Sequence, residues 1–325
     1  MTKLTRIAAT IGFSLVATAG LAQTELSIAT AYQDTNFHTQ NIALFAADVE
    51  EMTNGEVTFT LHTGASLLKM PEIMRGVQTG QVQAGEILLS AYGQESPFFE
   101  VDGIPFLSQG QKTAWQVYEL TLPHISARLE EKGLMPLFSV PWPGQGLYAQ
   151  KEINSTSDYE GVKFRAYNAL TARFAELMGA VPTTVQSAEV PQAFATGVVS
   201  AMITSAATGN YTKAWDFTSH YYDVNAMNNK NMVIMNADAF NGLSEAHQDA
   251  ILAAAAKAET RGWILSNDVQ SELTANLIAN GMTVDTPDDA LMAELENIGA
   301  KMVQEWLAKA GDKGVAFYEA YQALE

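Results

Sequence analysis

The fold is decided by three stretches of β type: ELSIAT at residues 25–30, VTFTL at 57–61 and AGEILLS at 84–90. Helical spacing separates these strands, because the apolar residues of 37–52 fall on one face and Pro71 precedes a short helix over 72–79. Strand–helix alternation of this kind predicts an α/β lobe built on a largely parallel sheet.

A second series of strands and helices follows the first. We expect strands over 134–140, 162–166, 198–204 and 232–236, and helices over 112–131, 170–178, 188–195, 245–265 and 289–308. Between the two series, the segment PWPGQG (141–146) interrupts regular structure after a buried strand, which is where ligand sites of α/β proteins form.

Two lobes with a long helical C-terminal region are therefore expected. The predicted lobe I comprises residues 23–146 and about 231–272, and the predicted lobe II comprises 147–230 and about 273–325. We expect the chain to cross between the lobes several times, and a ligand cleft to lie between them.

The first 22 residues have the pattern of a cleavable secretion signal. Lys3 and Arg6 precede an apolar stretch over 7–21, and Gly20 and Ala22 are small residues at the positions that a signal peptidase reads. The alternative is a membrane anchor, which needs roughly 20 apolar residues, and this stretch is shorter. We expect cleavage, and a mature protein that works outside the cytoplasmic membrane.

The composition excludes several classes of partner. Asp and Glu number 36 against 18 Lys and Arg, and the formal net charge is −18. Nucleic acids and anionic membrane surfaces bind through positive potential, so we expect neither as a partner. The chain has no cysteine, which excludes structural disulfides and thiolate metal sites.

Common catalytic motifs are missing from the sequence, including HExxH, GxSxG, the Walker loop and CxxC. The five histidines are scattered without the spacing of metal ligands, so we expect no cofactor and no metal ion. One enzymatic alternative is an exported α/β hydrolase or lyase in which Glu86 works with His38. It lacks a recognisable nucleophile or metal site.

Arg165 is the strongest single candidate for ligand binding. It lies in the predicted strand 162–166, where Val162, Phe164 and Ala166 alternate as buried positions, so Arg165 faces the opposite side of the sheet. A planar guanidinium can hold a carboxylate through two parallel hydrogen bonds. From the residues alone, the alternatives are an ordinary surface arginine and an internal ion pair.

Ordered segments along the chain show a family resemblance. They are FAADVEEMTNG (45–55), GASL (64–67), EIMRGVQTG (72–80), DGIPFL (102–107), GVKFRAYN (161–168), LMGAVP (177–182), AEVPQAF (188–194) and GVV (197–199). The set resembles the solute-binding proteins of tripartite ATP-independent periplasmic (TRAP) transporters, the DctP-type family. The resemblance covers almost all of the mature chain.

The resemblance implies a two-lobed periplasmic binding protein fold, similar to type II, that closes over an organic acid. In that family, the arginine matched by Arg165 clamps the ligand carboxylate. The polar residues that usually follow the GVV run are altered here, so a hydroxyl of Thr204 or Ser205 takes their place. Many members carry a second arginine near Gln145, and its replacement favours a monocarboxylate over a dicarboxylate.

Other candidates near the cleft have less specific signals. Trp142, between two prolines, either stacks on the ligand or caps a lobe, and we favour the ligand site. Glu86 either accepts hydrogen bonds from a ligand or pairs within its lobe. The remaining candidates for the ligand site are Asn168, Phe37, His38 and Trp215.

The sequence therefore predicts a periplasmic receptor for a small organic carboxylate. The resemblance implies the permease subunits of a TRAP transporter as its partner, and we expect a monomer. A sensor-associated binding protein would share the same pocket and differ only in its partner.

Overall fold

The computed structural model of the protein describes residues 23–324. The secretion signal expected over residues 1–22 lies outside this range. No helix within the described residues combines the length and the apolar character that crossing a membrane requires.

Two mixed sheets form the centres of two lobes. Sheet A, in lobe I, has the order β2-β1-β3-β10-β4, and its strands are β1 Thr24–Ala29, β2 Val57–His62, β3 Ala84–Leu88, β4 Leu134–Pro141 and β10 Lys230–Asn236. Sheet B, in lobe II, has the order β11-β9-β5-β8-β6-β7. Its strands are β5 Gln145–Ala149, β6 Lys163–Ala166, β7 Val181–Thr184, β8 Ala201–Ser205, β9 His220–Tyr222 and β11 Thr283–Asp285.

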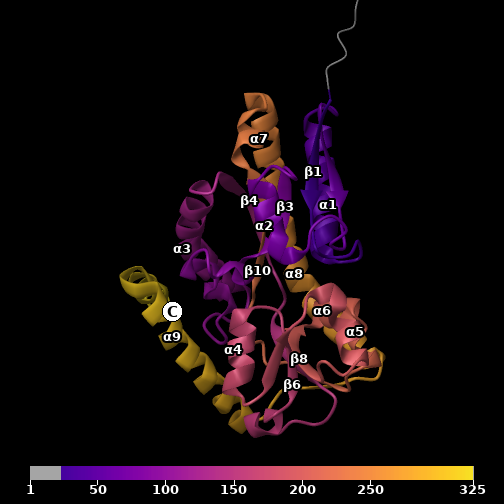
Figure 1. Ribbon diagram of the computed structural model, residues 1–325, viewed down its shortest axis with the longest axis vertical. Coiled ribbons are helices and arrows are strands. Elements are labelled where there is room, and N and C mark those ends of the chain that lie inside the picture. Colours follow the sequence, from indigo (N-terminus) through magenta and orange to yellow (C-terminus); the bar gives the residue numbers. More distant parts are fainter. Residues whose placement is uncertain (1–22, 325) are drawn as a thin grey trace, which may run out of the picture.

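Helices cover both sheets and join the two lobes (Figure 1). They are α1 Phe37–Met52, α2 Met70–Gln78, α3 Gln111–Glu130, α4 Ala169–Leu177, α5 Val190–Ala195, α6 Ala206–Tyr211, α7 Ala237–Asn241, α8 Glu245–Ala279 and α9 Asp289–Gln322. In lobe I, α1 packs on β2 and α8, α2 packs on β3, and α3 packs on β4. The expected strand–helix alternation is thus present, and short helices such as α2 end where a glycine follows.

Each sheet contains one strand that runs against its neighbours. β10 is antiparallel to both β3 and β4, and β5 is antiparallel to both β8 and β9. Both strands are the first that the chain enters after crossing from the other lobe. Because the crossing delivers the chain to the edge where the other strands end, the entering strand has to run in the opposite direction. The sequence predicted a strand over 232–236, which lies in β10, but not this reversal.

The two crossings lie side by side at the back of the cleft. The chain leaves sheet A after Pro141 and returns to it at Lys230. The backbone N–H of Trp142 donates to the carbonyl of Asn229 at 2.7 Å, and that of Gln145 donates to the carbonyl of Met227 at 3.1 Å. The paired crossings therefore fix where the two sheets meet.

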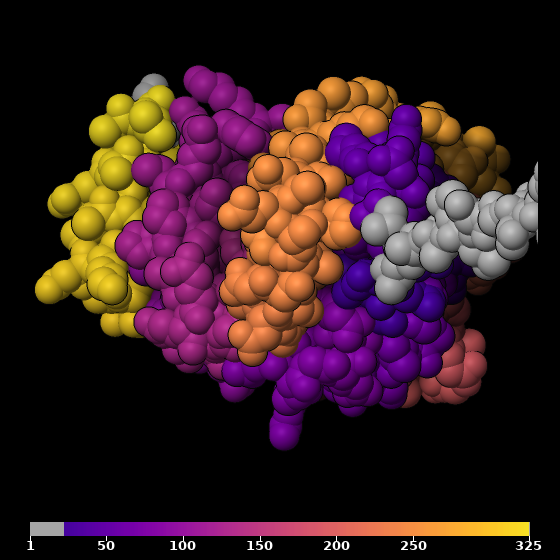
Figure 2. All heavy atoms as spheres, turned by 90° about the horizontal axis from the view of Figure 1, so that it is seen from above, coloured from indigo at the N-terminus to yellow at the C-terminus, as the bar shows by residue number. Residues whose placement is uncertain are grey.

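Two long helices also connect the lobes. The 35 residues of α8 span about 50 Å, and this helix contacts α1 and β4 in lobe I as well as α6 and β11 in lobe II. The lobe boundary expected near 272 falls inside this continuous helix. α9 contacts α4 in lobe II and α3 in lobe I, and Figure 2 shows its yellow C-terminal part beside α3. Both helices extend beyond the ranges predicted from sequence, because their later turns are held by packing across the lobes.

Candidate ligand-binding site

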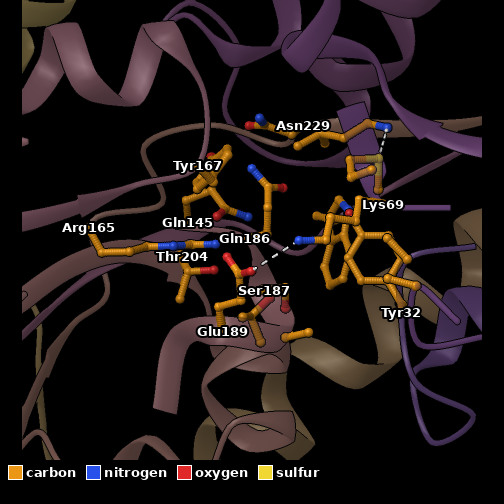
Figure 3. A pocket seen from close by; sticks show the side chains of 17 residues that line it. Tyr32, Lys69, Gln145, Arg165, Tyr167, Gln186, Ser187, Glu189, Thr204 and Asn229 are labelled. Atoms are coloured by element: carbon orange, nitrogen blue, oxygen red, sulfur yellow. Dashed lines mark hydrogen bonds and ion pairs between the residues drawn. The ribbon is translucent and has the colours of Figure 1, made fainter. Parts of the chain in front are cut away.

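A cavity of about 170 Å³ lies between the two lobes (Figure 3). Lobe I and the crossings line it with Ala31, Tyr32, Ala65, Lys69, Met70, Leu88, Trp142 and Asn229. Lobe II lines it with Gln145, Arg165, Tyr167, Gln186, Ser187, Ala188, Glu189, Thr204 and Thr208. Its volume is below the roughly 300–1,000 Å³ of sites for drug-sized ligands, so it suits a small solute.

The cavity lies at the carboxyl edges of the parallel strands of both sheets. Tyr32 follows β1 and Leu88 ends β3, while Arg165 and Thr204 stand near the ends of β6 and β8. Ligand sites of open α/β sheets form at this edge, because the loops that leave the strands there are free to carry polar groups.

Arg165 is the charged group at the centre of the site. Its side chain points into the cavity in Figure 3, and only 2% of the residue is exposed to solvent. Nε donates to the carbonyl of Val185 at 2.9 Å, and the guanidinium carbon lies 5.0 Å from the ring centre of Tyr167. Nη1 has no hydrogen-bond partner within the described chain, and Arg165 takes part in none of the ion pairs found there.

A buried cation without a carboxylate nearby is energetically costly. Burial lowers the pKa of Arg165 to about 10, and the nearby Tyr167 and Tyr32 oppose that shift only in part. The guanidinium nevertheless stays charged at neutral pH. The site is therefore arranged to receive an anion, whose charge would replace the lost hydration.

An aromatic wall on lobe I faces this cation. Trp142 and Tyr32 line the cavity with their ring centroids 5.1 Å apart, and Trp142 is 5% exposed. The indole Nε1 donates to Asn231 Oδ1 at 2.9 Å, which fixes the orientation of the ring. Trp142 was expected either to stack on the ligand or to cap a lobe. In the structure it lies on the cavity surface, where a ligand would meet its ring.

Two more predicted residues lie beside the guanidinium. Gln145 opens β5 and Thr204 lies on the adjacent β8, and both line the cavity near Arg165 (Figure 3). The amide nitrogen of Gln145 donates to the carbonyl of Pro143 at 3.1 Å, so its amide oxygen is the part of the amide that can accept from a ligand. Together they surround the anion site with neutral polar groups.

Polar contacts join the lobes around the cavity. They are Asn168 Nδ2 to Ser90 Oγ at 2.9 Å, the backbone N–H of Phe37 to Tyr211 Oη at 3.2 Å, and the ion pair Lys69 Nζ–Glu189 Oε1 at 3.8 Å. The last pair lies at the cavity rim, where Figure 3 marks it with a dashed line. The lobes thus meet around the cavity.

Other residues predicted for the site serve local structure in this arrangement. Asn168 caps α4, since its Oδ1 accepts from the N–H of Thr171 at 2.8 Å. Ser205 caps α6 in the same way, with its Oγ accepting from the N–H of Thr208 at 3.2 Å. Neither belongs to the cavity lining.

Phe37, His38, Glu86 and Trp215 also lie outside the lining. Phe37 begins α1, and Trp215 lies in a short 3₁₀ helix over Ala214–Asp216. His38 Nδ1 stands 3.4 Å from Glu86 Oε1, and both side chains are 1% exposed. Glu86 hydrogen-bonds to Thr30 and Asn231, so of its two predicted roles the structure shows pairing within the lobe.

Sequence reasoning missed a large part of the lining. The segment 186–189 follows β7, a strand that was not predicted from the sequence. Its position beside the cavity therefore could not be predicted from a strand end. Tyr32, by contrast, directly follows the predicted strand 25–30 and could have been found from that position. Tyr167 belongs to the quoted GVKFRAYN segment.

The fold and the cavity define a two-lobed binding protein with a buried cation, Arg165, in the cavity between its lobes. A family model described as "Bacterial extracellular solute-binding protein, family 7" (DctP) matches residues 28–310. The chain belongs to this family, as its ordered sequence segments predicted.

Solved structures of similar proteins share the fold along nearly the whole chain. DctP6 of Bordetella pertussis, an extracytoplasmic solute receptor binding pyroglutamic acid, is 42% identical with a TM-score of 0.91, over 92% of this chain and 100% of that one. DctP7 of the same organism, also described as binding pyroglutamic acid, is 43% identical with a TM-score of 0.91, over 92% and 99%. A marine metagenome TRAP solute-binding protein specific for pyroglutamate is 39% identical with a TM-score of 0.91, over 93% and 99%.

A curated relative matches over a shorter region. The solute-binding protein of Albidiferax ferrireducens is 27% identical over 173 residues, which are 52% of this chain and 51% of that protein. The chain thus spans about half the length of this relative.

Proposed function

We propose that this protein is a periplasmic receptor that captures pyroglutamate, or a ring monocarboxylate of similar size, and delivers it to a TRAP transporter. The observation that carries the proposal is Arg165, a buried guanidinium that has no ion-pair partner among residues 23–324 and points into a small cavity between the lobes.

One carboxylate is enough to complete this site. Two parallel hydrogen bonds from Arg165 would fix both the charge and the orientation of a planar carboxylate. Gln145 stands where many family members carry a second arginine, which supports one carboxylate per ligand. The overall negative charge of the protein does not prevent binding, because salt screens distant charges over about 8 Å.

The remainder of the cavity suits a small ring. Trp142, Tyr32, Met70 and Leu88 provide apolar and aromatic surface opposite the guanidinium. Pyroglutamate has one carboxylate on a five-membered lactam, so its ring would pack on this wall while its charge meets Arg165. The three proteins of 39–43% identity that are described as binding pyroglutamate support this choice.

Delivery follows from the family and the lobe arrangement. The ligand contacts both lobes, so it would stabilise the arrangement in which they meet, and a membrane permease would receive it when they separate. Export through the N-terminal signal and a monomeric state complete the proposal. The enzymatic alternative has less support, because Glu86 and His38 lie outside the cavity lining.

Titration calorimetry with four ligands tests the proposal. We expect L-pyroglutamate to bind with a stoichiometry of about one, because it carries both the carboxylate and the lactam ring. 2-Pyrrolidinone lacks only the carboxylate, and cyclopentanecarboxylate lacks only the lactam groups, so each should bind at least tenfold more weakly. L-Glutamate carries two carboxylates, so it tests whether the site accepts only one, and it should bind weakly as well.

Two outcomes would contradict the proposal. Equal affinity for 2-pyrrolidinone and L-pyroglutamate would show that the carboxylate is not recognised. Consumption of the ligand during prolonged incubation would favour the enzymatic alternative, whereas a receptor returns the ligand unchanged.

A further inference from the structure

A cluster of buried polar side chains lies directly behind the aromatic wall of the cavity. We call it the Glu86 cluster; it consists of Thr30, His38, Glu86 and Asn231. All four are at most 2% exposed, and none of them lines the cavity. Buried polar groups that neither bind the ligand nor cap a helix require another explanation.

The carboxylate of Glu86 accepts hydrogen bonds on both of its oxygens. Oε1 accepts from Asn231 Nδ2 at 2.8 Å, and Oε2 accepts from Thr30 Oγ1 at 2.5 Å. The three residues stand on β10, β3 and at the end of β1, which are neighbours in sheet A. One side chain therefore ties together the three central strands at the edge where the cavity lies.

Each carboxylate oxygen of Glu86 is also connected, through its hydrogen-bond partner, to one residue of the aromatic wall. On one side, Asn231 Oδ1 accepts the indole N–H of Trp142 at 2.9 Å, so the Asn231 amide links Glu86 to Trp142. On the other side, Thr30 Oγ1 accepts the backbone N–H of Tyr32 at 3.2 Å. Both wall residues are thus connected to one carboxylate through a single intervening side chain.

No water-sized space adjoins these hydrogen bonds. The space among His38, Glu86 and Asn231 is too small to hold a water molecule. The ring of His38 packs on Trp142 at 4.3 Å between centroids and closes the remaining side. If the carboxylate were removed, the amide N–H of Asn231 and the hydroxyl proton of Thr30 would stay buried without the acceptor that each has now, which favours reorientation of both side chains.

We propose that Glu86 is a positioning residue of the ligand site, which holds Trp142 through Asn231 and Tyr32 through Thr30 without touching the ligand. The proposal rests on the proposed function only in that Trp142 and Tyr32 face the ligand; the hydrogen-bonded connection itself is independent of which ligand binds. Glu86 thereby sets the shape of the cavity wall, and with it the selectivity for ring size.

The test compares Glu86→Leu with Glu86→Gln in the full-length mature protein. Leucine removes both acceptors, whereas glutamine keeps one acceptor for Asn231 and offers an N–H to Thr30. We expect the affinity for L-pyroglutamate to fall at least tenfold in Glu86→Leu and less than threefold in Glu86→Gln. Asn231→Leu breaks only the branch to Trp142 and should lose at least fivefold.

A second measurement needs no ligand. With 5-fluorotryptophan incorporated, each tryptophan gives one ¹⁹F resonance, and Trp142→Phe identifies that of Trp142. This resonance should shift or broaden in Glu86→Leu and Asn231→Leu, and should stay near its wild-type position in Glu86→Gln. Failure of the proposed ligand would remove the affinity effect alone, while this resonance would still report on the cluster.

Glu259→Leu is the matched control. Glu259 is a partly buried acid of lobe I, less buried than Glu86, that accepts from Tyr118 Oη at 3.2 Å and from the N–H of Ser139 at 3.3 Å, away from the cavity. Its loss should perturb Trp263 nearby and leave the Trp142 resonance and the affinity unchanged. An unshifted Trp142 resonance in Asn231→Leu would overturn the proposal, even if Glu86→Leu failed to fold.

Discussion

The two faces of the cavity differ in kind. Lobe II presents charge, since Arg165 points into the cavity with Gln145 and Thr204 beside it. Lobe I presents a wall of Trp142 and Tyr32, whose polar support lies behind the rings. On the lobe II face the charged group, Arg165, lines the cavity. On the lobe I face the ionisable group, Glu86, lies behind the rings and does not line it.

In the proposed function, this difference would couple binding to closure. A carboxylate would pair with Arg165 while the cleft is open to water, and the pair would strengthen once the wall of lobe I excludes water from it. The wall would bury little apolar surface without a ring against it. A ligand with both a carboxylate and a ring would therefore stabilise the closed arrangement more than either part alone.

The largest expected effect is on the charged face. Arg165→Ala should reduce the affinity for L-pyroglutamate by more than a hundredfold in calorimetry, because no other cation of the described residues lies buried in the lining. Arg165→Lys keeps the charge but loses the two-pronged geometry, and an intermediate loss of about tenfold or more is expected.

The melting temperature of ligand-free Arg165→Ala serves as its control. Since the variant removes a buried charge without an ion-pair partner, it should melt no lower than the wild type. Undiminished affinity would show that the charged face is not where the ligand anchors.

An intermediate effect is expected at Glu86, behind the wall of lobe I, as a dependence of the free energy of unfolding on pH. Burial raises the pKa of Glu86 from 4.5 to about 7, against the hydrogen bonds from Thr30 and Asn231 that lower it. Between these two values the folded chain binds more protons than the unfolded chain, so the free energy of unfolding falls as the pH rises. In urea unfolding, the free energy of unfolding of the wild type should fall between pH 5 and pH 8 by up to about 3 kcal/mol more than that of Glu86→Gln.

The difference between the two proteins isolates Glu86, because other buried acids titrate equally in both. If the free energy of unfolding changed with pH in the same way in the wild type and in Glu86→Gln, ionisation of the buried Glu86 carboxyl would not destabilise the fold. The proposed difference between the two faces of the cavity would then lose this support.

The smallest effect is expected at the rim. Lys69 and Glu189 pair at 3.8 Å with 67% and 57% of their side chains exposed, so Lys69→Ala should weaken binding by about threefold at most. Calorimetry at about 20 and 500 mM salt should show that this small difference disappears in high salt. A loss above tenfold would instead make Lys69 a second cation for the ligand and would place charge on both faces.

The fold was largely predictable because its signals are local. The alternation of strands and helices in 25–90 and the strand around Arg165 reflect periodic burial, which neighbouring residues encode. The reversed strands β5 and β10 carry no such signal, since their direction depends on where a crossing enters a sheet. The short strands β7, β9 and β11 are likewise held by their neighbours rather than by a strong pattern of their own.

The candidate site was predictable in part. Arg165, Trp142, Gln145 and Thr204, chosen from strand position and family resemblance, all line the cavity. The role of Glu86 was left open between ligand contact and pairing within the lobe, because a buried acid in an apolar strand looks the same in both cases.

The sequence by itself determined the α/β class, the family and the arginine at the cleft, since each depends on residues close together in the chain. Only the tertiary structure decided which side chains meet at the cavity and which support it from behind. Glu86 lies 56 positions from Thr30 and 145 from Asn231. Hydrogen bonds over such separations form only after the strands have been brought together, so no local pattern can encode them.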